Sequence, residues 1–283
     1  MKKIGVFDSG FGGLTILKSI RNVLPEYDYI YLGDSARAPY GTRSFEVIYQ
    51  YTLQAVRYLQ EHDCRLIIIA CNTASAKALR TIQQHDIDPG KIRVLGVIRP
   101  TAEAVAHPTP LLPYSSTPLL PSTHIGVLAT PGTVSSESYI LELRKLNPNL
   151  IITQQACPLW VELIENNRMD SPEMEAAIRL YMDELLTKDP EIETIILGCT
   201  HYPLIQDKIE KALLPYPSTP LLLSQGDIVA HSLKDYLLRH PEIDKELRRE
   251  GSCVYLTTDV ADKFDASASL FLGEHIHSKQ VTL

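Results

Sequence analysis

The sequence is poor in cysteine, and its cysteines are not arranged to cross-link the chain or to hold a metal ion. There are five in 283 residues, and no two of them form a CxxC pair. The odd count and the spacing argue against a disulfide framework, a zinc site and a thioredoxin-like motif. A chain of this length buries enough apolar surface to fold without such cross-links. A reducing compartment fits this pattern, so we expect a cytoplasmic protein with no bound metal.

The chain also lacks a long apolar run and a block of basic residues. No stretch approaches the roughly 18 apolar residues of a membrane helix, and the chain reaches Asp8 too early for a signal peptide. Its 27 Lys and Arg residues face 34 Asp and Glu residues, a net charge of −7. Nucleic-acid binding and anionic-membrane binding both depend on positive charge, so we expect neither partner. An enzyme with a small-molecule substrate is the favoured class.

The chain does contain a regular alternation of short apolar runs with longer segments of helical period. One helical segment begins after Ser44 and another after Ser171, and serine commonly caps the start of a helix. This alternation predicts an α/β protein with mainly parallel sheets flanked by helices. The predicted strands are residues 4–7, 29–32, 66–70, 93–97, 125–129, 151–154, 194–197 and 254–257.

Two features divide the predicted structure into two similar halves. The segment 107–124 is rich in proline, which excludes a helix and indicates an extended surface loop or a linker. In addition, a strand that ends in a cysteine-containing polar turn occurs twice, as LIIIACNT around Cys71 and as TIILGCTH around Cys199. The repeated pattern predicts two similar half-sites.

The first predicted strand leads into the glycine-rich turn FDSGFGG, which contains Asp8 and Ser9. In open α/β folds, ligands bind at the carboxyl ends of strands, so both residues are candidates for ligand binding. The alternative is that Asp8 only caps the helix that follows. The spacing is not GxGxxG, and an acidic residue does not suit a pyrophosphate, so a dinucleotide site is disfavoured.

Three further segments contain weaker candidates. The loop YLGDSARAPYG offers the backbone N–H groups near Tyr40 and Gly41 to a carboxylate, although such loops usually serve only as turns. The turn VLATPGT places the hydroxyl of Thr130 at another strand end, where helix capping is a strong alternative. Glu165 lies with Glu162 on a short helical segment, and both could belong to its solvated face.

The two cysteine turns are the strongest signal for chemistry. Each thiol is predicted at a junction between a strand and a helix, where free amides and the helix dipole favour the thiolate. We therefore expect their pKa values to lie below the ordinary value of about 8.5. The alternative is that they are small buried hydrophobic residues, which we expect of Cys64, Cys157 and Cys253. The polar neighbours of Cys71 and Cys199 argue against that alternative.

Two thiols that face a shared cleft are suited to a racemase. One base removes a proton from a carbon atom, and a second group returns a proton from the opposite face, which inverts the configuration. Asp8 and His201 are then the natural helpers of Cys71 and Cys199, respectively, because each can orient a sulfur or relay its proton. This assignment rests on sequence position.

In this order, the segments closely resemble the glutamate racemases, cofactor-independent enzymes that supply D-glutamate for peptidoglycan. The resemblance covers nearly the whole chain. It is carried by FDSGFGG, YLGDSARAPYG, IACNTASA, VLATPGTV, ACPLWVELIE and LGCTHYPLI, and more weakly by LLLSQGD and YLTTDVADKF.

The resemblance implies that Cys71 and Cys199 are the catalytic acid/base groups. Cys71 would deprotonate the D-enantiomer and Cys199 the L-enantiomer, without pyridoxal phosphate or any other cofactor. Thr130 and Glu165 match positions near the family's active site. The implied substrate contacts come from Asp8, Ser9, Tyr40, Gly41, Asn72, Thr73, Thr200 and His201.

The resemblance also implies a domain organisation. Family members have two α/β domains with the active site in the cleft between them, and the second domain is inserted into the first. In this chain the first domain would comprise residues 1–97 and 223–283, and the second would comprise residues 98–222. A homodimer is implied in the same way.

Three alternatives remain open. An aspartate racemase or a related amino-acid racemase would share the paired cysteines, although GCTHYP and the DSG turn favour glutamate. A non-catalytic amino-acid-binding protein would keep the cleft, but it would need neither Cys71 nor Cys199. A redox-active thiol protein is weakened because no resolving cysteine lies nearby in the sequence.

Overall fold

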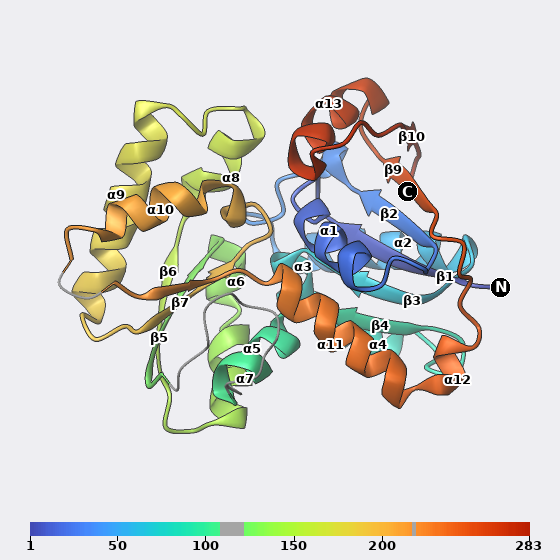
Figure 1. Ribbon diagram of the computed structural model, residues 1–283, viewed down its shortest axis with the longest axis horizontal. Coiled ribbons are helices and arrows are strands. Elements are labelled where there is room, and N and C mark those ends of the chain that lie inside the picture. The colour runs from blue at the N-terminus through green and yellow to red at the C-terminus, as the bar shows by residue number, and fades with distance from the viewer. Residues whose placement is uncertain (108–121, 217–218) are drawn as a thin grey trace.

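The computed structural model describes residues 1–107, 122–216 and 219–283, which form two parallel sheets side by side, each flanked by helices (Figure 1). The first and last parts of the chain build one sheet, and the middle part builds the other. Both termini therefore lie on the side of the first sheet (Figure 1). The predicted α/β class with parallel sheets is confirmed. Most of the predicted proline-rich loop at 107–124 lies outside the described residues.

The larger sheet has the strand order β10-β9-β2-β1-β3-β4, and its strands are parallel. β1 lies between β2 and β3, so the turns that follow β1 and β3 meet at one edge of the sheet. The strands are β1 (Lys3–Asp8), β2 (Tyr29–Gly33), β3 (Cys64–Ile69), β4 (Arg93–Gly96), β9 (Cys253–Thr257) and β10 (Ser278–Gln280).

The smaller sheet has the order β6-β5-β7-β8 and is also parallel. Its strands are β5 (His124–Ala129), β6 (Ile151–Ala156), β7 (Thr194–Gly198) and β8 (Leu221–Leu223). All eight predicted strands are present in the two sheets. β8 and β10 were not predicted, because three residues are too few to show a strand period.

The helices follow the strands as the alternation predicted. Both predicted caps are confirmed, since Ser44 and Ser171 each accept a hydrogen bond from the backbone N–H three residues later. The α-helices are α1 (Leu14–Val23), α2 (Phe45–Glu61), α3 (Asn72–Lys77), α4 (Leu79–His85), α5 (Ile98–Ala106), α6 (Pro131–Ser135), α7 (Ser138–Leu146), α8 (Pro158–Glu165), α9 (Pro172–Lys188), α10 (Gln206–Leu213), α11 (Gly226–Arg239), α12 (Pro241–Asp244) and α13 (Ala261–Leu272). The 3₁₀ turns are η1 (Ser35–Arg37) and η2 (Tyr202–Ile205).

The central strands are apolar along their whole length because both faces of each sheet are covered. In β3, Leu66 and Ile68 join a core cluster that includes α1 and α11, whereas Ile67 and Ile69 join a cluster that includes α2. Successive residues of a strand point to opposite faces, so the run LIII packs against helices on both sides. β3 is therefore packed on both faces until two residues before Cys71.

The chain crosses between the two sheets twice. It leaves the larger sheet after β4, enters the smaller sheet through α5, and returns after β8 through α11. The orange helix α11 runs back to the larger sheet, where it packs on α1 (Figure 1). The predicted boundary at 97/98 falls at the first crossing, and the one at 222/223 falls inside β8. Both boundaries remain predictions.

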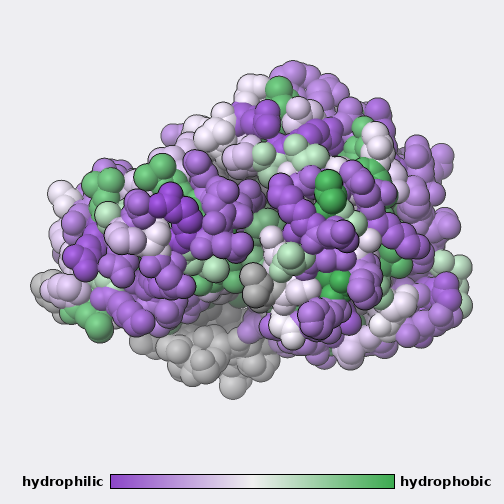
Figure 2. Space-filling model, turned by 90° about the horizontal axis from the view of Figure 1, so that it is seen from above, coloured by the Kyte–Doolittle hydropathy of each residue, from purple (hydrophilic) through white to green (hydrophobic). Residues whose placement is uncertain are grey.

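The face of the molecule seen in Figure 2 is mainly hydrophilic, with hydrophobic residues scattered over it. The large exposed hydrophobic side chains belong to separate elements, for example Phe45 on α2, Leu141 on α7 and Leu238 on α11. Within the described ranges, no helix is long and apolar enough to cross a bilayer. The homodimer remains a prediction.

Candidate active site

A cavity of about 140 Å³ lies between the two sheets. Ser9, Cys71, Thr130, Cys157 and Cys199 line it, and each lies within two residues of the carboxyl end of β1, β3, β5, β6 or β7. The cavity is therefore at the strand edge where ligands bind in open α/β folds. Its lining residues are Ser9, Pro39, Tyr40, Gly41, Thr42, Cys71, Asn72, Thr73, Thr130, Pro131, Cys157, Pro158, Val161, Glu162, Glu165, Cys199, Thr200 and His201.

All predicted site residues except Asp8 line this cavity. Asp8 is fully buried behind the wall. Its carboxylate accepts hydrogen bonds from the backbone N–H of Gly10 at 3.0 Å and from the hydroxyl of Thr200 at 3.3 Å. Burial raises the pKa of Asp8, although His201 and the backbone N–H groups act in the opposite direction. Asp8 thus links the first turn of the larger sheet to the Cys199 turn of the smaller sheet.

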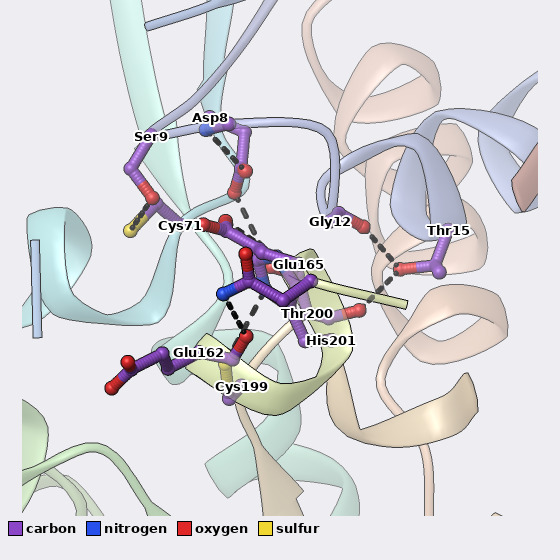
Figure 3. Close-up of polar contacts among 12 residues, drawn as sticks. Asp8, Ser9, Gly12, Thr15, Cys71, Glu162, Glu165, Cys199, Thr200 and His201 are labelled. Carbon is purple, nitrogen blue, oxygen red and sulfur yellow. Dashed lines mark hydrogen bonds and ion pairs between the residues drawn. The ribbon is translucent and has the colours of Figure 1, made fainter. Parts of the chain in front are cut away.

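Cys71 occupies one side of the cavity at the start of α3 and is 5% exposed. Its thiol donates a hydrogen bond to the hydroxyl of Ser9 at 3.4 Å (Figure 3). Burial, reinforced by the nearby charge of Asp8, raises the pKa of Cys71 to about 12. The expectation that the start of a helix would lower this pKa is therefore wrong, because desolvation outweighs the effect of a helix only six residues long.

Cys199 occupies the other side of the cavity and has a different polar partner. Its sulfur lies 3.8 Å from Nδ1 of His201, and Nε2 of His201 lies 3.1 Å from Oε1 of Glu165 (Figure 3). Burial alone lowers the pKa of His201, but the contacts with Cys199 and Glu165 outweigh it and raise this pKa well above its ordinary value. The sulfur of Cys199 and the carboxylate of Glu165 therefore contact the two ring nitrogens of His201, and both contacts favour the protonated imidazole.

The predicted contact of His201 with Cys199 is present, but Asp8 does not contact the thiol of Cys71. His201 contacts the sulfur of Cys199, as expected. Cys71 is hydrogen-bonded to Ser9 and interacts with Asp8 only through charge. Asp8 instead contacts Thr200, the residue that follows Cys199.

Gly12 lets the two halves approach closely behind Cys199. A Cβ atom at this position would lie 2.5 Å from Nδ1 of His201 and 2.6 Å from Oγ1 of Thr200. Thr15, at the start of α1, donates a hydrogen bond to the backbone carbonyl of Thr200 at 3.1 Å. The glycine-rich turn therefore supports the Cys199 turn through direct contact.

Hydroxyl groups also line the cavity. Oγ1 of Thr73, on α3, lies 2.8 Å from Oγ1 of Thr130 and 3.3 Å from Oγ1 of Thr133. Gly41 accepts a hydrogen bond from the backbone N–H of Gly132 at 2.7 Å, which holds the Tyr40 loop against the same turn. The hydroxyl groups of Thr73 and Thr130 can donate hydrogen bonds to a small anion without a fixed positive charge, an arrangement suited to carboxylates.

The hydroxyl of Tyr40 is not available to an anion in the cavity. Its hydroxyl is hydrogen-bonded to the carboxylate of Asp34, which also pairs with Arg37 at 2.7 Å and accepts from Thr258 at 2.8 Å. Burial, together with Asp34, raises the pKa of Tyr40, so the phenol stays protonated. The ring anchors the loop and leaves the backbone of Tyr40 and Gly41 at the cavity.

Several site residues were not predicted from the sequence. Cys157 was expected to be a packing residue, and it is 1% exposed, but it also lines the cavity. Val161 and Glu162 line it from α8, although the helical period favoured the solvated face for Glu162 and indicated no role for Val161. Gln225 and Tyr139 contact Asn72 from distant elements, and no local sequence signal could have shown this. Among the described residues, no group of three His, Cys, Asp or Glu side chains is arranged to hold a metal ion.

Comparison with known proteins gives a consistent result. A family model described as Asp/Glu/Hydantoin racemase matches residues 13–226. The glutamate racemase of Ruegeria sp. (strain TM1040) is 41% identical over 274 residues, which cover 96% of this chain and 97% of that protein. Two solved structures have the same architecture over nearly the full length of both chains. The glutamate racemase of Francisella tularensis, in complex with D-glutamate, has a TM-score of 0.82 at 33% identity and covers 99% of this chain and 97% of its own. That of Bacillus anthracis has a TM-score of 0.84 at 31% identity, with coverages of 100% and 98%.

Replacing Asp8 with asparagine is expected to lower the pKa of Cys71, because the variant removes a neighbouring charge and keeps the shape of the side chain. The rate at which iodoacetamide alkylates Cys71, measured by mass spectrometry across a pH series, should then begin to rise at a lower pH. The control is Asp63→Asn, which changes an exposed carboxylate paired with Lys2 and should leave the profile unchanged. Identical Cys71 profiles in wild type and Asp8→Asn would contradict this role of Asp8.

Replacing Glu165 with glutamine is expected to lower the pKa of His201, because the imidazolium loses a carboxylate 3.1 Å from Nε2. The measurement is the NMR titration of the His201 ring signals. Glu162→Gln is a matched control on the same helix and the same cavity wall, and it should leave the titration of His201 unchanged. A shift of equal size in both variants would show that the contact with Glu165 has no special effect.

Proposed function

The chain belongs to the Asp/Glu/Hydantoin racemase family, and we propose that it interconverts L- and D-glutamate with Cys71 and Cys199 as its two acid/base groups. The class of enzyme predicted from the sequence, an amino-acid racemase and hence an isomerase, is confirmed by the family and by relatives that match nearly the whole chain. The choice of substrate, the role of each thiol and the biological role are proposals.

One observation carries the proposed mechanism: Cys71 and Cys199, from the two halves of the chain, line one small cavity, and each has its own polar side-chain partner. A binding protein would need neither thiol. Inversion at a carbon atom needs a proton acceptor on one face and a proton donor on the other. The placement of Cys71 and Cys199 supports that division of roles.

In the direction from L- to D-glutamate, Cys199 acts as the base. Its thiolate takes the α-proton, so the Cα–H bond breaks and an S–H bond forms, and the carbanion is protonated on its other face by the Cys71 thiol. The raised pKa of Cys71 keeps that thiol protonated and ready to donate. A protonated His201 beside the sulfur of Cys199 provides the positive charge that a thiolate prefers.

The reverse direction uses the same groups in exchanged roles. Cys71 takes the α-proton of D-glutamate, and Cys199 donates to the opposite face. The enzyme that has converted one L-molecule holds its proton on Cys199 and its negative charge on Cys71, the state required for the D-enantiomer. Proton exchange with solvent, or one turnover of D-glutamate, returns Cys199 to the thiolate and Cys71 to the thiol.

The lining of the cavity supports a free amino acid with carboxylate groups as the substrate. Thr73 and Thr130 supply hydroxyl donors at the cavity wall. Such donors stabilise the negative charge that develops toward the α-carboxylate as the proton leaves. The Francisella tularensis relative binds D-glutamate within the same fold, which supports glutamate as the substrate of this chain.

We propose that no cofactor takes part. Pyridoxal phosphate reacts through a Schiff base with a lysine, and the cavity-lining residues of the described chain include none. Cellular D-glutamate made by this reaction would serve peptidoglycan synthesis, as the resemblance to glutamate racemases implies, and we place the protein in the cytoplasm on the same ground.

Replacing either thiol with serine should slow racemisation about a hundredfold or more, because a hydroxyl is a far weaker acid than a thiol and cannot replace it in proton transfer. The change in circular dichroism of L-glutamate and, separately, of D-glutamate measures each direction. Cys253→Ser changes a thiol outside the cavity and should racemise like wild type.

The outcomes of this experiment separate the alternatives. Retained racemisation in both Cys71→Ser and Cys199→Ser would exclude the two-thiol mechanism. A wild-type protein that binds glutamate without racemising it would be a binding protein. Faster turnover of L-aspartate than of L-glutamate by the wild type would identify an aspartate racemase.

A further inference from the structure

Asn72 lines the cavity and also belongs to a closed ring of buried hydrogen bonds. Its Nδ2 donates to Oε1 of Gln225 at 2.6 Å, and Nε2 of Gln225 donates to the hydroxyl of Tyr139 at 2.8 Å. The hydroxyl of Tyr139 in turn donates to Oδ1 of Asn72 at 2.7 Å. Each member of the ring donates to the next, so the three side chains fix one another.

A second anchor sets the direction of this ring. Nε2 of Gln225 also donates to Oγ1 of Thr101 at 2.8 Å and lies 3.5 Å from the carbonyl oxygen of Val97. The hydroxyl hydrogen of Thr101 is used by that same carbonyl, at 2.7 Å, so Thr101 can only accept from Gln225. A carbonyl and an accepting hydroxyl both require the nitrogen of the Gln225 amide, which leaves its oxygen facing Asn72.

The orientation of the Gln225 amide fixes the positions of the nitrogen and the oxygen of the Asn72 amide. The oxygen of Gln225 requires the nitrogen of Asn72, and the hydroxyl of Tyr139 then meets the oxygen of Asn72. Burial raises the pKa of Tyr139, so this phenol remains a neutral donor. One hydrogen on Nδ2 of Asn72 remains, and no group in the described part of the chain accepts it.

The three residues of the ring and its anchor, Thr101, come from elements that lie far apart in the sequence. Asn72 begins α3 and Tyr139 lies in α7, whereas Thr101 lies in α5 and Gln225 immediately precedes α11. The last two elements are the two crossings between the sheets. The ring therefore joins both crossings to a residue at the cavity wall beside Cys71.

We propose that Gln225 and Tyr139 are positioning residues that hold the Asn72 amide with its remaining N–H directed at the cavity, where it donates to a carboxylate oxygen of the substrate. This inference rests on the proposed function and takes the substrate contact of Asn72 from it; the positioning of that amide by Gln225 and Tyr139 is the new part. A buried N–H without a partner is unfavourable, so a carboxylate that accepts from it is bound more tightly. An amide free to rotate would present its oxygen to the carboxylate half of the time and would repel it.

The test is Tyr139→Phe, which removes one hydroxyl and opens the ring. The KM for L-glutamate and for D-glutamate should each rise about threefold, with a smaller change in kcat, because the Asn72 amide keeps its bond to Gln225 but loses the donor to its oxygen. Tyr29→Phe is the matched control, because it also removes a buried hydroxyl, bonded to the carbonyl of Leu24 at 2.6 Å, but lies away from the cavity. It should leave KM unchanged.

A double-mutant cycle separates positioning from a purely structural role. If Tyr139 acts through Asn72, then Tyr139→Phe should have no further effect on KM in an Asn72→Ala background. Titration calorimetry with D-glutamate gives the same comparison where turnover is too slow. Thermal melting of each variant shows how much of any effect is a loss of stability.

The inference and the proposed function fail in different ways. Normal racemisation by wild type, with an unchanged KM in Tyr139→Phe, would overturn the inference alone. A rise in KM that recurs in full in the Asn72→Ala background would also overturn it. A wild-type protein that neither racemises nor binds glutamate would overturn the proposed function, and the inference with it.

Discussion

The carboxyl ends of all strands in a parallel sheet lie at one edge, and the site of this chain depends on that constraint. Two such edges face one cavity, so Cys71 from one sheet and Cys199 from the other reach the same small space. The long crossings through α5 and α11 make this possible, because they let the middle of the chain form its own sheet. Two-sided helix packing then holds the strand ends firmly enough to place each sulfur.

The second determinant is the cost of burying charge. Asp8 and His201 are buried and Glu165 is partly buried, and each makes polar contacts that act against the cost of its desolvation. The two thiols experience this environment differently. Cys71 meets a hydroxyl and a nearby carboxylate, whereas Cys199 meets an imidazole held by Glu165. In the proposed mechanism, this asymmetry supplies a protonated donor on one face and a stabilised base on the other.

Much of the fold could be predicted because its signals are local. Buried strands show as apolar runs, and Ser171 caps its helix through an N–H three residues away. The cysteine turns were visible for the same reason. The pKa of Cys71 was predicted in the wrong direction, since a helix start can be read in a sequence while the burial of the thiol cannot. Gln225 and Tyr139 were missed because their contact with Asn72 exists only after the crossings fold.

The central claim is that two different groups exchange protons with opposite faces of the substrate. The most direct test is the early distribution of deuterium when wild-type protein converts L-glutamate in D2O. We expect the first D-glutamate formed to carry deuterium at Cα, because the Cys71 thiol exchanges with solvent before it donates. The L-glutamate recovered at the same time should carry almost none. Equal deuterium in both enantiomers, or protium retained in the product, would indicate a single base and would contradict the account.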